Sequence, residues 1–178
     1  VDVASPGYAE SAQIVSGALA RSREFVDFAL PRRIAPPLLS RYEAGMNYGA
    51  HADAAIMNLA GGRLRSDLSC TVFLSDPNSY VGGELSIVIG NQAIAFKGEA
   101  GEAIVYSSTT MHEVVPVVSG QRLVSITFIE SMIADAQRRE LVYQLNELAA
   151  TEGLRMSWEG RVRLDVARQN LLRMWGTP

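Results

Sequence analysis

The chain has 178 residues, of which 48% are hydrophobic and 20% charged, and its formal net charge is −3. This composition is typical of one globular domain with a single core, and the mild acidity excludes a general affinity for nucleic acid or for anionic membranes. The apolar runs are much shorter than a bilayer span requires, and no basic leader with an apolar segment opens the chain. We therefore expect a cytoplasmic protein without a membrane segment.

The predicted elements fall into three stretches. Between residues 8 and 30 apolar side chains recur every three or four positions up to Pro31, which predicts an amphipathic helix that packs on a sheet. From about residue 35 to 130 the pattern changes to seven or eight short β-rich runs separated by glycines and turn residues. A block of this kind predicts a sandwich or a jelly roll, so the fold class is mainly β with flanking helices.

Helical spacing returns from residue 131, in two segments separated by Gly153. No linker precedes them. We predict that residues 1–130 form the β domain with its N-terminal helix, and that residues 131–178 are a helical extension of the same domain. Their apolar stripes indicate core packing, although Met174 and Trp175 are equally consistent with a subunit contact, so a homodimer through the C-terminal helices is a candidate assembly.

Both histidines of the chain belong to one pattern. His51 stands two residues before Asp53, and residues so spaced in a strand point to the same side. His112 follows after a long gap, and Arg122 stands ten residues later in the next predicted strand. Two imidazoles and one carboxylate form the facial triad that holds non-haem Fe(II) and leaves other coordination positions open. The arginine would be a bidentate, permanently charged partner for a dicarboxylate cosubstrate.

Each of these residues also has a plain structural interpretation. A histidine in a half-apolar strand is often a core residue, Asp53 could cap a turn before Ala54, and Arg122 could form a surface ion pair. The segment HAD alone is a weak indication of a metal. Both histidines, Asp53 and Arg122 in this order favour the metal interpretation.

The segment AAIMNLAGGRLRSD, after Asp53, carries a glycine pair and two arginines. We hypothesise that it is a lid over the site, with Arg63 and Arg65 contacting an acidic or carboxylate-bearing substrate. A mobile surface loop explains the same residues equally well.

Four segments resemble the Fe(II) and 2-oxoglutarate dependent dioxygenases, and within them the bacterial PKHD-type hydroxylases, relatives of prolyl 4-hydroxylases. These segments are RYEAGMNYGAHAD, FLSDPNSYVGGELSI, GEAIVYSSTTMHEVVPVVSGQRLVSITFIESM and VARQNLLRMW. The resemblance implies a double-stranded β-helix, also called a jelly roll. It also implies Fe(II), 2-oxoglutarate and O2 as cofactors, with ascorbate as a candidate reductant.

The resemblance assigns roles residue by residue. It makes His51, Asp53 and His112 the iron ligands and hence the catalytic residues. It makes Arg122 the partner of the distal carboxylate of 2-oxoglutarate, and it places Tyr42 in the wall of the cosubstrate pocket.

The resemblance also reaches residues nearer the substrate. Tyr48 matches a tyrosine on the substrate side, and Phe128 takes a position where some prolyl hydroxylases carry tryptophan. Phe73 stands where relatives often have a tyrosine, so one hydroxyl is missing from the pocket. Ser69 or Thr71, on the same strand face, would supply a replacement, and the sequence does not choose between them.

The activity implied is hydroxylation of an unactivated C–H bond with release of succinate and CO2. The implied substrate is a peptidyl proline or lysine, or a small amino-acid-like or iron-chelating, siderophore-like molecule. A cupin-like metalloenzyme is one alternative, although cupins usually carry an H-x-H pair with a glutamate, which is absent here. A zinc hydrolase would need Glu113 as its base. A non-catalytic iron or 2-oxoglutarate sensor would keep the same ligands.

Overall fold

The structure is a computed structural model that describes residues 7–177 of the chain. Its N-terminal part contains two helices where the sequence predicted one: α1 spans Tyr8–Arg21 and α2 spans Arg23–Ala29. Ser22 has an extended backbone, and its hydroxyl accepts a hydrogen bond from the N–H of Phe25, so it caps α2. The apolar periodicity continues through Ser22, and for this reason the pattern alone did not predict the break.

The strands run almost without interruption between the two helical ends of the chain, and every pairing between them is antiparallel. Their bounds are β1 Pro31–Ile34, β2 Leu38–Glu43, β3 Tyr48–His51, β4 Ile56–Leu59, β5 Gly62–Arg65, β6 Leu68–Phe73, β7 Tyr80–Gly82, β8 Leu85–Ile89, β9 Gln92–Phe96, β10 Ala103–Ser107, β11 His112–Val114 and β12 Val117–Ser131. A short 3-10 helix, Pro77–Ser79, precedes β7.

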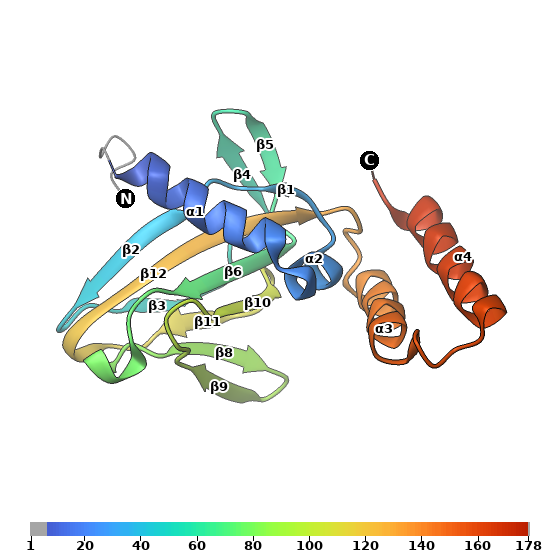
Figure 1. Cartoon of the computed structure of the whole chain (residues 1–178). Coiled ribbons are helices and arrows are strands. Elements are labelled where there is room, and N and C mark those ends of the chain that lie inside the picture. Colours follow the sequence, from blue (N-terminus) through green and yellow to red (C-terminus); the bar gives the residue numbers. More distant parts are fainter. Residues whose placement is uncertain (1–6, 178) are drawn as a thin grey trace.

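The strands form two main sheets and one hairpin. The first sheet has the order β1-β12-β6-β10, with β2 and β7 also paired to β12. The second sheet has the order β3-β11-β8-β9, and β4 and β5 form a separate hairpin that projects from the body in Figure 1. This is a jelly-roll arrangement, so the predicted fold class is confirmed.

Helices α1 and α2 cover one face of the first sheet (Figure 1). Their apolar side chains and those of β6 and β12 form one buried cluster, whose members are Val15, Leu19, Phe25, Ala29, Leu68, Cys70, Val72 and Ile129. Because side chains alternate along a strand, the other face of β6 and β12 is turned toward the second sheet. The candidate site residues of β12, including Arg122, lie on that inner face.

The two C-terminal helices are α3, Ala136–Glu152, and α4, Trp158–Trp175. Helix α3 packs against α2, where the Phe28 and Tyr143 rings meet edge to face at 5.1 Å between centroids. Trp175 packs beside a small buried cluster at the end of β12, whereas Met174 is exposed. The division into residues 1–130 and 131–178 and the homodimer through these helices stay predictions. None of the helices in the described part of the chain has the length and hydropathy needed to cross a membrane.

Candidate active site

The sheet pairing brings the two histidines together. His51 is the last residue of β3 and His112 the first of β11, and the two lie directly opposite each other in the antiparallel pair. Their rings are 4.3 Å apart between centroids. Asp53 follows β3, and its backbone N–H donates to the carbonyl of Ser108 at 3.0 Å. The chain thus turns the carboxylate back toward the two imidazoles.

The three side chains form one compact ligand group. Asp53 Oδ1 lies 3.8 Å from His51 Nε2, and Asp53 Oδ2 lies 3.7 Å from His112 Nε2. One ligand atom from each of the three residues falls within 4.8 Å of the others, and no fourth His, Cys, Asp or Glu joins them among residues 7–177. Atoms that share one metal ion at about 2.1 Å are about 3–4 Å apart, so the spacing suits a metal ion. Two imidazoles and one carboxylate suit non-haem Fe(II).

Backbone carbonyls fix which nitrogen each histidine offers. His51 Nδ1 lies 2.8 Å from the carbonyl oxygen of Gly49, and His112 Nδ1 lies 2.9 Å from that of Thr110. Because a carbonyl only accepts, each Nδ1 must carry the hydrogen and donate it. In the neutral imidazoles Nε2 is therefore unprotonated and faces Asp53, and such outer contacts commonly orient metal-binding histidines.

Arg122 is a buried cation with unused donors. Its side chain is 1% exposed, and its Nε and Nη1 groups have no hydrogen-bond partner among the described residues. Leaving buried donors of a charged group unpaired costs about 1–3 kcal/mol or more. Tyr42 lies opposite Arg122 in β2, with its ring centroid 5.0 Å from the guanidinium carbon. The arrangement has the donors for a planar anion such as a carboxylate.

The residues around Arg122 restrict its side chain, and its guanidinium keeps its positive charge. Burial lowers the pKa of its guanidinium, and the neighbouring Tyr42 and Tyr80 partly offset this shift. An arginine starts from so high a pKa that it stays charged. Gly83, with φ +68°, closes over its stem, because a Cβ there would lie 3.0 Å from Arg122 Cδ and 2.8 Å from Val117 Cγ2. The residues present therefore fit a dicarboxylate cosubstrate.

Two serines and a tyrosine complete the surroundings of Asp53, and the sequence reasoning missed part of this set. Ser69 donates to Asp53 Oδ2 at 2.5 Å, and Ser108 lies behind Ser69 at 2.8 Å between hydroxyl oxygens. Tyr106, in β10, lies with its ring 4.9 Å from that of His112, and burial, then the charge of Asp53, raises its pKa. Tyr106 of β10 pairs with Ser69 of β6, so the two side chains lie on the same face of the sheet. The alternation of residues in these two strands was the signal in the sequence that could have indicated Tyr106.

These contacts bear on whether Ser69 or Thr71 replaces the tyrosine hydroxyl that is missing at Phe73. The single proton of the Ser69 hydroxyl is donated to Asp53. Thr71 is buried on the same face of β6, beside Tyr106. With the Ser69 proton engaged by Asp53, the Thr71 hydroxyl is the better candidate donor to a cosubstrate, and this contact stays a prediction.

The two residues predicted to lie near the substrate occupy different environments. Tyr48 is 54% exposed, and its ring stands edge to face on that of His51 at 4.3 Å between centroids. Phe128 is half-buried on β12, opposite Ser69. Tyr48 is thus at the open side of the histidine pair, and Phe128 lines the interior. Contact of either with a substrate stays a prediction.

The segment predicted to be a lid is the regular hairpin β4–β5. Arg63 is exposed on it. Arg65 instead donates to both carboxylate oxygens of Asp67, at 2.8 and 2.9 Å, and to the carbonyl of Ser131 at 3.0 Å. The structure therefore separates the two arginines: one is engaged at the base of the hairpin, and the other is available at its surface.

Glu113 lies apart from the ligand group. It follows His112 in β11 and pairs with Ser86 of β8. Because successive residues in a strand point to opposite faces of the sheet, its carboxylate is directed away from the face that carries His112. The one acidic residue that a zinc hydrolase would use as base is not positioned for that role.

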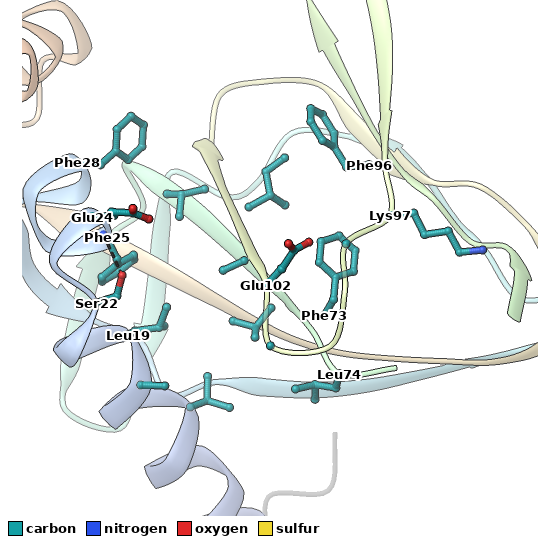
Figure 2. Close-up of a pocket in the computed structure, with 18 of the residues that line it drawn as sticks. Leu19, Ser22, Glu24, Phe25, Phe28, Phe73, Leu74, Phe96, Lys97 and Glu102 are labelled. Atoms are coloured by element: carbon teal, nitrogen blue, oxygen red, sulfur yellow. Dashed lines mark hydrogen bonds between the residues drawn. The ribbon is translucent and has the colours of Figure 1, made fainter. Parts of the chain in front are cut away.

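A groove of about 1020 Å³ lies elsewhere, between the N-terminal helices and the segment around β9 and β10. Figure 2 shows Phe25 and Phe28 of α2 on one side of it and Phe73 and Phe96 on the other. Among the described residues that line it, Phe73 is the one that the sequence analysis had placed in the cosubstrate pocket, and the ligand group, Arg122, Tyr42 and Tyr48 are not among them. The groove is on the helix-covered side of the first sheet, and the ligand group is not part of it.

The fold and the site define a non-haem iron oxygenase, and comparison with known proteins gives the same class. The family model of the 2OG-Fe(II) oxygenase superfamily matches residues 37–130. The chain belongs to this superfamily and, within it, to the PKHD-type hydroxylases.

The relatives are named consistently. A PKHD-type hydroxylase of Sphingopyxis alaskensis is 51% identical over 168 residues, which cover 94% of this chain and 77% of the relative. A PKHD-type hydroxylase of Stenotrophomonas maltophilia is 42% identical, with 97% of this chain and 77% of the relative covered. The protein is accordingly an oxidoreductase whose family uses Fe(II), 2-oxoglutarate and O2.

Solved structures share the fold. A prolyl-4-hydroxylase of Pseudomonas putida has a TM-score of 0.53 and 21% identity, covering 71% of this chain and 70% of that chain. A 2OG-Fe(II) oxygenase family oxidoreductase from Burkholderia pseudomallei has a TM-score of 0.54 and 24% identity, covering 67% of this chain and 56% of that chain. These likenesses concern the fold alone.

Proposed function

We propose that this enzyme hydroxylates an unactivated C–H bond, with His51, Asp53 and His112 holding Fe(II) and Arg122 binding the distal carboxylate of 2-oxoglutarate. The observation that carries the proposal is the buried Arg122, two of whose donors have no partner within residues 7–177, in the same barrel as a His–Asp–His group. A structural arginine would have internal partners for these donors. Bound Fe(II) would activate O2, which is the oxidant, and 2-oxoglutarate would supply two electrons and leave as succinate and CO2 while the substrate C–H bond supplies the other two.

The chain itself orients and shields the reactants. The Nδ1 contacts of the two histidines hold their rings, and the negative charge of Asp53 balances part of the metal charge. Arg122 aligns a dicarboxylate through its charged fork, and Tyr42 forms the wall beside it. Because Arg122 is almost fully buried, water is excluded from the end of the cosubstrate pocket, which strengthens the ion pair.

The reaction class is tested by measuring succinate formed from 2-oxoglutarate under O2 with added Fe(II). We expect slow turnover without a prime substrate, faster turnover with one, and complete loss after chelation of the metal, restored by Fe(II). Each mole of hydroxylated product should accompany one mole of succinate. A protein that binds iron and never consumes 2-oxoglutarate, even with candidate substrates, would instead be the sensor considered above.

The substrate is proposed to be a peptidyl proline or lysine, or a small amino-acid-like or iron-chelating molecule. Exposed apolar side chains lie close to the histidines in sequence: Met46 and Tyr48 before His51, and Met111 immediately before His112. Of these, Tyr48 has its ring edge to face on that of His51, and this contact supports binding of a substrate with an apolar part beside its reacting carbon. The name prolyl-4-hydroxylase, carried by one structural neighbour, favours a prolyl ring as the first candidate.

Arg63 is the proposed contact for a carboxylate on the substrate, and Arg65 is its matched control. Replacing Arg63 by Ala should raise the KM of an acidic substrate about tenfold, because one charge-assisted hydrogen bond contributes roughly 1.5–3 kcal/mol. Turnover of 2-oxoglutarate without substrate should persist. Replacing Arg65 by Ala should mainly lower the melting temperature, since its partners are Asp67 and Ser131. An unchanged KM for the Arg63 variant would rule out the lid contact.

A further inference from the structure

Three buried serines form a continuous hydroxyl chain that ends on Asp53. The Ser66 and Ser108 hydroxyl oxygens are 2.8 Å apart, the Ser108 and Ser69 oxygens are 2.8 Å apart, and Ser69 reaches Asp53 Oδ2 at 2.5 Å. Ser66, Ser108 and Ser69 are 6%, 2% and 0% exposed. They come from three places: Ser66 from the short link between β5 and β6, Ser69 from β6, and Ser108 from the turn after β10.

The hydrogen bonds along this row of three serine hydroxyls can be donated in one direction only, toward Asp53. An ionised carboxylate accepts hydrogen bonds and has none to donate, so Ser69 must give its proton to Asp53. The contact between Ser69 and Ser108 then needs the proton of Ser108, because a hydroxyl has one. The contact between Ser108 and Ser66 likewise needs the proton of Ser66. All three hydroxyl dipoles therefore point toward Asp53, and hydrogen bonds in series strengthen one another.

Ser108 also holds the main chain of Asp53. Its carbonyl accepts the backbone N–H of Asp53 at 3.0 Å, while its own N–H donates to the carbonyl of Asp67 at 3.1 Å. Substitution of the Ser108 side chain leaves these two backbone contacts in place. The hydroxyl contribution can therefore be measured separately from the local fold.

We propose that the chain Ser66–Ser108–Ser69 positions the Asp53 carboxylate for metal binding, by occupying Oδ2 with a protein donor and leaving Oδ1 as the oxygen offered to the metal. This inference depends on the proposed metal site. The three serines are positioning residues: they act through Asp53 and have no contact with a reactant. Outer contacts of this kind change metal affinity by about 10–100-fold when they are removed.

The test is Mn(II) binding to the purified protein, followed by the loss of the electron paramagnetic resonance signal of free Mn(II). Replacing Ser69 by Ala should weaken Mn(II) binding about tenfold. The matched control is Ser125→Ala in β12. Ser125 is 1% exposed, it faces the helix-covered side of the sheet opposite Val72, and its hydroxyl has no hydrogen-bond partner within residues 7–177. The control should bind Mn(II) as the wild type does.

A double-mutant cycle tests the chain as a unit. Ser108→Ala should weaken Mn(II) binding by a smaller factor, about two- to threefold, since Ser69 keeps its contact with Asp53. In the Ser69→Ala background the same replacement should have no further effect, because Ser108 acts only through Ser69. Additive effects would overturn the relay.

The outcomes separate this inference from the proposed function. If the wild type binds Mn(II) and Ser69→Ala binds it equally well, the positioning role is wrong while the metal site stands. If the wild type binds no Mn(II), the metal site itself is wrong. If Ser69→Ala lowers the melting temperature of the metal-free protein and leaves Mn(II) affinity unchanged, the serine chain has a structural role alone.

Discussion

Replacing Asp53 by Asn is expected to lower metal affinity about a thousandfold and to abolish 2-oxoglutarate turnover. The amide keeps the shape of the side chain and an oxygen for the Ser69 hydroxyl, but it removes the negative charge from the ligand group. Two unit charges about 4 Å apart attract by about 4 kcal/mol at an effective dielectric constant of 20, which corresponds to about a thousandfold in affinity. Mn(II) titration and succinate release measure the two effects.

The control for this experiment is Glu113→Gln, an identical loss of one carboxylate charge one residue beyond His112. Glu113 is paired to Ser86 and directed to the other face of its sheet, so this variant should keep wild-type metal affinity and turnover. Loss of turnover in Glu113→Gln would show that the effect of removing a carboxylate charge near His112 is not specific to Asp53. Normal turnover in Asp53→Asn would remove Asp53 from the ligand group.

Replacing Arg122 by Met is expected to change stability and cosubstrate binding in opposite directions. The substitution removes a buried cation whose Nε and Nη1 have no partner among the described residues, and it keeps an unbranched apolar stem. The free energy of unfolding without ligand should rise by about 1–3 kcal/mol. The affinity for 2-oxoglutarate should fall by about 3–4 kcal/mol, a few hundredfold, because a bidentate charged contact is lost.

Thermal unfolding and calorimetric titration with 2-oxoglutarate give the two quantities on the same sample. Arg122→Lys is the matched variant, since it keeps the charge and loses the planar fork. We expect it to bind 2-oxoglutarate with an affinity between those of the wild type and Arg122→Met. A Met variant that unfolds at a lower temperature and still binds 2-oxoglutarate normally would show that Arg122 is a structural residue.

A melting-temperature shift provides an independent check of the same assignment. A ligand at one hundred times its dissociation constant stabilises the folded state by about 2.7 kcal/mol. The wild type should therefore melt at a higher temperature with 2-oxoglutarate and metal present, whereas Arg122→Met should show no shift at the same concentration. Succinate, which carries both carboxylates and lacks the keto group, should stabilise the wild type less.

The sequence alone predicted the fold class, and it predicted that His51, Asp53 and His112 lie together; their role as metal ligands stays a prediction. Strand-length apolar runs bounded by turn residues reveal a β barrel, because alternation and turn chemistry are local properties of the chain. With two histidines in the whole chain, their order with Asp53 and Arg122 left few alternatives for a metal site. Ser22 is the counterexample within the helices, since one capping side chain outweighed a continuous apolar stripe.

The tertiary structure was needed to identify the side chains that contact these residues. The pairing of β3 with β11 brings His51 beside His112. The link before β6, β6 itself and the turn after β10 together build the row of serines behind Asp53. The tertiary structure also gives the two arginines of the hairpin different environments: Arg63 is exposed, and Arg65 is hydrogen-bonded to Asp67. Contacts between segments far apart in sequence depend on which strands pair and which turns meet, and the local pattern of residues does not name the partner of a strand.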